Sequence, residues 1–163
     1  MGSSGWMYRT QYSPDVGAAL QRLRQEVFDR GDYWQPWLEL GWGMDPEMVP
    51  PDELLPPEID RESLLSTGPP HNINDALWLT MPDGTHSVLD ILRVEPMPGF
   101  AVAAPLPTEQ LTALFGTQHP TVQDVEREQE KLQSALDRGS AWYIVAYEAD
   151  EPVALVFVGR TGD

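Results

Sequence analysis

Residues 142–158 read WYIVAYEADEPVALVFV, and this stretch decides the fold. Two runs that are apolar at nearly every position, 142–147 and 152–158, flank four turn residues, 148–151. Apolar side chains on successive residues are typical of a strand that is buried on both faces. The segment therefore predicts a β-hairpin whose two strands lie in the middle of a sheet.

The N-terminal part predicts one more strand, followed by a helix. Between residues 6 and 12 apolar and polar residues alternate with the period of two that a half-buried strand shows. Ser13-Pro14-Asp15 then supplies an N-cap hydroxyl, a proline for the first helical position and an acid near the positive end of the helix dipole. We expect the helix to end at Gly31. Residues 1–5 are expected to be a flexible leader or a tag remnant.

A second hairpin is predicted in the middle of the chain. Residues 71–80 and 87–94 flank Pro82-Asp83-Gly84, which is a turn signal. Residues 87–94 also fit a helical turn, because Ser87 and Asp90 have the spacing of a capping box. Their short length and β-branched residues favour a strand. A further strand is expected at 99–102.

Two more helices are expected before the C-terminal hairpin. Thr108 would cap a short helix that ends at Gly116, and Thr121 would cap the longest helix of the chain, which ends at Gly139. The buried side of that helix would carry Val125, Leu132, Ala135 and Leu136. The expected fold class is α+β: one domain over residues 6–163, with a mostly antiparallel sheet, two longer helices and the C-terminal β-hairpin.

A proline-rich acidic excursion is expected at about 44–70. Prolines fix the backbone and remove hydrogen-bond donors, so this stretch should hold turns and extended pieces, with at most a short helix near 59–65. It carries many carboxylates and one arginine, Arg61.

Composition excludes several classes of protein. The 163 residues, 41% of them apolar, suffice for one core. The absence of cysteine excludes disulfides, thiolate metal sites and a cysteine nucleophile. The net charge of −16 repels nucleic-acid phosphates and anionic lipids. The sequence has neither a membrane-length apolar run nor a secretory signal, so we expect a cytoplasmic protein with no membrane partner. From the charge we expect no nucleic-acid partner either. We also expect no cofactor.

Polar chemistry is concentrated near residues 84–90. His86, Ser87 and Asp90 are candidate catalytic residues, together with His119 in a later loop. Neighbours on a strand point to opposite faces, which argues against a His86–Ser87 dyad. Turn and capping roles are the simpler interpretation of these residues. The ligand spacing favours no metal site, and no phosphate-binding glycine motif occurs.

A partner-binding surface is the other candidate. Tryptophans outside regular elements and nearby carboxylates could form it, because exposed aromatics ringed by acids are typical of binding faces. The residues are Trp34, Trp37, Trp42, Asp45, Glu47, Asp52, Glu53, Glu58, Asp60 and Glu62. Trp6, Trp78 and Trp142 fall in predicted strands and are expected in the core.

Three functions are compatible with these observations. The leading hypothesis is an acidic, non-enzymatic binding domain, an inhibitor or immunity-type protein, that engages a basic partner. The alternative is a small hydrolase or metal-dependent enzyme in which His86, Asp90 and His119 converge. A third is a structural or regulatory subunit whose hairpin completes a sheet in a homodimer.

Overall fold

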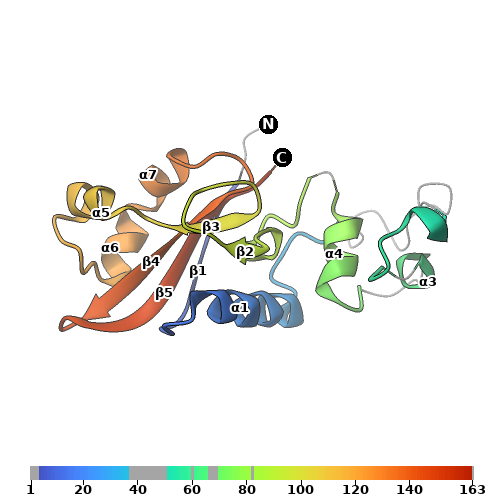
Figure 1. Ribbon diagram of the computed structural model, residues 1–163, viewed down its shortest axis with the longest axis horizontal. Coiled ribbons are helices and arrows are strands. Elements are labelled where there is room, and N and C mark those ends of the chain that lie inside the picture. The colour runs from blue at the N-terminus through green and yellow to red at the C-terminus, as the bar shows by residue number, and fades with distance from the viewer. Residues whose placement is uncertain (1–3, 37–50, 60, 66–69, 82, 163) are drawn as a thin grey trace.

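Strands β4 (Ala141–Glu148) and β5 (Glu151–Arg160) form the predicted C-terminal hairpin. The computed structural model describes residues 4–36, 51–59, 61–65, 70–81 and 83–162. Strand β1 (Gly5–Gln11) pairs with β5, and β3 (Val102–Pro105) pairs with β4, so both hairpin strands are central as predicted. With the short β2 (Arg93–Val94) at the far edge, the strand order is β1-β5-β4-β3-β2 (Figure 1).

The sheet is mixed. The two long pairings, β1 with β5 and β5 with β4, are antiparallel, whereas the short pairings of β3 with β4 and β2 are parallel. The α+β class is therefore confirmed. Because neighbours occupy both sides of the hairpin, only β1 and β2 keep an unpaired side in the described sheet. The homodimer stays a prediction, but the described hairpin strands have no free edge through which a second copy could extend the sheet.

Helices cover both faces of the sheet. Along β5, Leu155 and Phe157 belong to the core beneath α1 (Val16–Arg30), whereas Val156 and Val158 belong to the core beneath α6 (Val122–Arg127) and α7 (Gln129–Ser134). This explains why the hairpin sequence is apolar at successive positions. Each such side chain contributes about 1.5–3 kcal/mol by leaving water.

The first strand and helix form as predicted, with a shift of the cap. Asp15, not Ser13, is the N-cap of α1, and its carboxylate accepts a hydrogen bond from the N–H of Ala18 at 3.0 Å. The Ser13 hydroxyl accepts from the N–H of Asp15 instead. Gly31 ends the helix in the left-handed conformation at φ 67°.

The predicted hairpin of residues 71–80 and 87–94 is wrong. Helix α4 (Ile73–Leu79) replaces its first arm, and Asn72 caps this helix by accepting a hydrogen bond from the N–H of Asp75. The second arm begins with the 3-10 helix η2 (Val88–Asp90), capped by Ser87, and only Arg93–Val94 is a strand. The capping-box spacing of Ser87 and Asp90 thus predicted the helical turn correctly, whereas the β-branched residues did not. In a segment this short, a side-chain cap determines the backbone conformation.

The later helices differ from the expectation in several respects. Helix α5 (Thr108–Phe115) forms and ends at Gly116, but its N-cap is Pro107 and not Thr108. The predicted longest helix is divided at Glu128 into α6 and α7, and α7 ends at Ser134 without reaching Gly139. Thr121 caps α6 in a capping box, as predicted. Glu128 has φ −99° and ψ 13°, outside the helical region, so the chain changes direction there. Val125, Leu132 and Leu136 are buried, but Ala135 is exposed, contrary to prediction.

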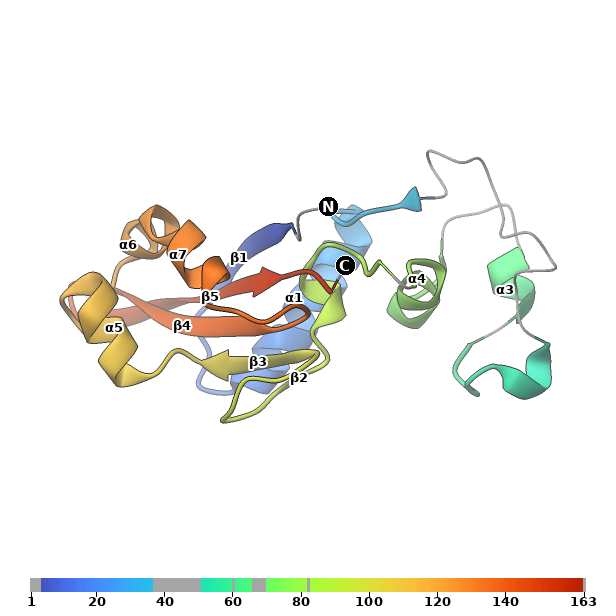
Figure 2. The same ribbon diagram turned by 90° about the horizontal axis from the view of Figure 1, so that it is seen from above.

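The acidic excursion holds only short elements where it is described. These are the 3-10 helix η1 (Asp52–Leu54) and α3 (Arg61–Leu65), which confirms the predicted short helix near 59–65. Helix α3 packs against α4. Both lie at one end of the sheet, whereas α5, α6 and α7 lie at the other (Figure 2). Residues 37–50 fall outside the described residues.

Candidate functional site

A cavity of about 530 Å³ opens at the end of the sheet that faces α4. Its floor is made by residues that flank the strands: Leu92 before β2, Ala101 before β3, Gly139 before β4 and Gly162 after β5. Helix α4 and residues 56–59 form the opposite wall. A cavity of this size, with few polar groups, is the usual form of a binding site.

The backbone around this cavity adopts an uncommon conformation at four places. Gly84, Ala101 and Gly139 line it with φ of 78°, 58° and 73°, and His86, just beyond Gly84, has φ 55°. Residues other than glycine rarely adopt a positive φ. Those that do are often found at functional sites. The concentration at this cavity marks it as the candidate functional site.

Asp90 supplies the carboxylate of the cavity. Its Oδ1 accepts two hydrogen bonds from Thr85, one from the backbone N–H and one from the hydroxyl, both at 2.8 Å. Its Oδ2 is buried and has no hydrogen-bond partner. Burial raises the pKa of Asp90 above its ordinary value, and the Thr85 hydrogen bonds, nearby His86 and the backbone N–H of Ser87 offset only part of that rise. Asp90 therefore presents an unsatisfied acceptor.

Gly84 gives the Asp90 carboxylate its room. A Cβ at Gly84 would lie 2.9 Å from Oδ2, and the positive φ already disfavours any other residue. The Gly84 N–H donates to the carbonyl of Thr80 at the end of α4, which ties this loop to the helix. The glycine lets the backbone pass close to the carboxylate.

The walls and rim of the cavity are largely apolar. Leu77 and Trp78 of α4 face Ile59 and the strand ends. Three lining side chains are exposed although apolar: Met81 at 62%, Leu92 at 45% and Phe100 at 76%. Grouped exposed apolar side chains are typical of a surface that contacts another molecule. Glu58 adds a second carboxylate, and none of the described residues that line the cavity is a Lys or Arg.

The structure brings together three of the four predicted catalytic residues. Ser87 caps η2 by accepting from the N–H of Leu89 at 3.2 Å, and its hydroxyl contacts that of Thr85 at 2.8 Å. The His86 ring stacks on Trp34 at 5.1 Å between centroids. Ser87 therefore acts as the cap that its position suggested, and Asp90 alone of the candidates faces the cavity.

His119 lies elsewhere in the fold. Its Nδ1 lies 3.2 Å from Oδ1 of Asp150 in the β4–β5 turn, and its ring stacks on Tyr147 with centroids 4.0 Å apart. That turn lies near α6, at the end of the sheet away from α4 (Figure 1). The predicted convergence of His119 with Asp90 is absent from the described structure, because the strands hold the two residues at different ends.

The predicted partner-binding residues are only partly described. Asp52, Glu53, Glu58 and Glu62 are exposed, and Trp34 is half-buried against His86. Of these, Glu58 lines the cavity. Trp37, Trp42, Asp45, Glu47 and Asp60 lie outside the described residues.

Several cavity residues were not singled out from the sequence. Trp78 was assigned to the core of a strand, but it is a half-buried wall residue of α4. Phe100 and Gly139 meet because the loop before β3 and the loop before β4 converge, and a Cβ at Gly139 would lie 2.6 Å from the Phe100 ring. Only the glycines at 84 and 139 offered a signal, since each follows the end of a predicted element.

Metal and membrane features were also sought. Within the described part of the chain, no three His, Asp or Glu side chains converge as a metal site requires. In the same residues, no helix combines the length and the apolar character needed to cross a bilayer. Comparison with protein-family models, curated proteins and solved structures finds no match for this chain.

Proposed function

We propose that this protein is a non-enzymatic binding domain that engages a basic protein, and that its cavity accepts one Lys or Arg side chain of that partner. The observation that carries this proposal is the Asp90 carboxylate, whose buried Oδ2 lies without a hydrogen-bond donor in an apolar cavity. A buried acceptor of this kind is stabilised by an incoming cationic donor.

The shape of the cavity suits a long basic side chain. The stem of Lys or Arg is aliphatic and can pack along Leu77, Trp78 and Met81 while its charged end reaches the carboxylate. Trp78 and Phe100 add aromatic faces, which attract cations. A neutral apolar ligand would leave Asp90 unpaired, and an anionic ligand would be repelled by Asp90 and Glu58.

The charge of the whole molecule supports the same partner. A net charge of −16 attracts a positive surface over distance and accelerates its encounter. Exposed carboxylates at Asp52, Glu53 and Glu62 lie in the segments that lead to the cavity wall. This combination suits an inhibitor or immunity-type protein that blocks a basic enzyme.

Affinity capture with two charge-matched variants tests the proposal. Asp90→Asn removes the negative charge of Asp90 but keeps the shape of its side chain. Glu126→Gln is the control, because it removes the charge of one exposed carboxylate on α6. We expect a basic protein from the native host to be retained by the wild type and by Glu126→Gln, and lost by Asp90→Asn. With that partner purified, calorimetry should show affinity weakened at least about tenfold by Asp90→Asn. No retained protein, or equal retention by Asp90→Asn, would overturn the proposal.

A further inference from the structure

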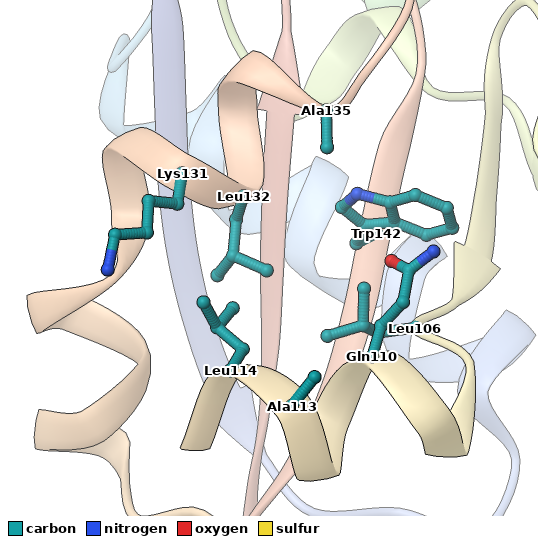
Figure 3. A pocket seen from close by; sticks show the side chains of 8 residues that line it. All are labelled: Leu106, Gln110, Ala113, Leu114, Lys131, Leu132, Ala135 and Trp142. Carbon is teal, nitrogen blue, oxygen red and sulfur yellow. The ribbon is translucent and has the colours of Figure 1, made fainter. Parts of the chain in front are cut away.

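A second, smaller cavity lies on the other side of the molecule from Asp90, between α5 and α7. Its volume is about 260 Å³, and its walls are Leu106, Ala113, Leu114, Leu132, Ala135 and Trp142, with Gln110 and Lys131 (Figure 3). It lies over the sheet face whose core includes Val125 and Val156, whereas η2 packs on the α1 face. The two cavities share no lining residue.

Trp142 gives this cavity one unsatisfied donor. Its side chain is only 5% exposed, and its indole Nε1 has no hydrogen-bond partner. A buried indole N–H normally finds an acceptor, because leaving it unpaired costs free energy. Trp6 also has a buried Nε1 without a partner, but its ring packs tightly over Gly159 and lines none of the described cavities. Of these two tryptophans in the described residues, Trp142 is the one whose side chain lines a cavity.

Among the described residues that line this cavity, Lys131 is the one charged residue, and it does not face the interior. The Lys131 side chain extends away from Trp142 (Figure 3), and its Nζ lies 2.7 Å from Oε2 of Glu128. Gln110 reaches from α5 toward the indole and offers a neutral amide at the mouth. An ion in this cavity would lose its water without gaining a counterion, so the walls favour a neutral ligand.

Helix α5 is the movable wall. None of its residues is buried, although Leu111, Leu114 and Phe115 pack partly against the core. A helix held this loosely can adjust to an occupant at low cost. A dry apolar cavity of about 150 Å³ is known to hold benzene, so 260 Å³ has room for a substituted ring.

From these observations we propose that the cavity between α5 and α7 binds a small neutral aromatic compound that carries a hydrogen-bond acceptor, with Trp142 Nε1 as the donor to that acceptor. The ring occupies the space among Leu106, Leu114 and Leu132. The acceptor oxygen satisfies the indole N–H. This site is independent of the basic-partner proposal, and either can fail without the other.

The test uses three probes of similar size: acetophenone, which has a ring and a carbonyl acceptor, ethylbenzene, which lacks the acceptor, and benzoate, which is charged. The indole N–H resonance of Trp142 is identified in a proton–nitrogen spectrum as the one lost in Trp142→Phe. We expect acetophenone to shift this resonance downfield with a Kd on the order of 0.1–1 mM. Ethylbenzene should bind about three- to tenfold more weakly, and benzoate more weakly still.

A second variant fills the space without removing the donor. Ala113 is exposed on α5 and lines the cavity, so Ala113→Leu should keep the fold and abolish the acetophenone shift, with circular dichroism as the check on folding. Exposed Thr112 is not among the lining residues, and Thr112→Val serves as the matched control with unchanged binding. No shift up to the solubility limit, equal binding by Ala113→Leu, or benzoate or ethylbenzene binding as tightly as acetophenone would overturn the proposal.

Discussion

Thr85 donates two hydrogen bonds to the same oxygen of Asp90, from its backbone N–H and from its hydroxyl, each 2.8 Å long. Both donors approach Oδ1, so the carboxylate is fixed in orientation, while the buried Oδ2 has no hydrogen-bond partner and Asp90 lines the cavity. Thr85 itself is fully buried, and its hydroxyl also contacts that of Ser87 at 2.8 Å. The loop thus fixes one oxygen of the carboxylate and leaves the other without a hydrogen bond.

Replacing Thr85 by valine should destabilise the protein. Thr85→Val keeps the volume but removes the hydroxyl that donates to Asp90, so we expect a loss of about 1–3 kcal/mol in the free energy of unfolding. The pKa of Asp90 should rise further, because one hydrogen bond to its charged form is lost. Urea denaturation and carboxyl-carbon NMR titration measure the two effects. Thr112→Val, on the exposed face of α5, is the control and should change stability by less than about 0.5 kcal/mol.

The raised pKa of Asp90 implies a defined pH dependence. The folded protein holds the proton more tightly than the unfolded chain does, so the Asp90 contribution to stability is greatest below its ordinary pKa of 3.8 and is lost as the pH rises through the raised pKa. Asp90→Asn should therefore raise the free energy of unfolding at pH 7 by roughly 0.5–2 kcal/mol. The gain should shrink as the pH falls toward 3.8. Denaturation at several pH values checks this, and destabilisation by Asp90→Asn at pH 7 would contradict it.

Gly139→Ala should disturb the floor of the Asp90 cavity. Gly139 has φ 73°, and an added Cβ would lie 2.6 Å from the Phe100 ring, so we expect a cost of about 1–2 kcal/mol. In a Phe100→Ala background the clash disappears and only the backbone cost remains, which a double-mutant cycle measures. Gly17→Ala is the comparison: Gly17 lies inside α1 with space around it, and its replacement should stabilise by up to about 1 kcal/mol. Equal effects at both glycines would refute this account.

The β4–β5 turn contains removable strain. Ala149 and Asp150 form a two-residue loop with φ of 48° and 64°, a turn in which Asn-Gly is preferred. Ala149→Asn should stabilise the protein by about 0.5–1 kcal/mol and leave the contact between His119 and Asp150 in place. Thermal unfolding measures the change. Ala149→Val should have the opposite sign, because a β-branched residue is strongly disfavoured at positive φ.

The sequence predicted best those elements whose pattern reflects the whole fold. The hairpin was predictable because neighbouring residues such as Leu155 and Val156 are both apolar. In a strand these two side chains point to opposite faces, so both faces must be buried. Helix α1 was predictable from the start signal Ser13-Pro14-Asp15 and from Gly31. Helix α4 and η2 were not, because elements this short are set by caps and tertiary packing rather than by periodicity.

The candidate site was predicted only in part for the same reason. Asp90 was identified because it stands with Thr85 and Ser87 at the start of an element. Its apolar surroundings come from segments distant in sequence, since Trp78, Phe100 and Gly162 meet only when the strand ends are aligned. His119 could not be excluded from the sequence, because the strand register that sets it beside Asp150 is invisible there.

The pairing of β1 with β5 bears on the order in which the protein folds during synthesis. Trp6 pairs with Gly159, and the N–H of Thr161 donates to the carbonyl of Ser4. β1 therefore leaves the ribosome before β5 and must wait for all the elements between them before its partner exists. The hairpin, by contrast, closes locally. Because residues 4 and 161 are close, a short peptide could join them in a circularly permuted variant with new termini elsewhere. In that variant β1 and β5 would be synthesised consecutively.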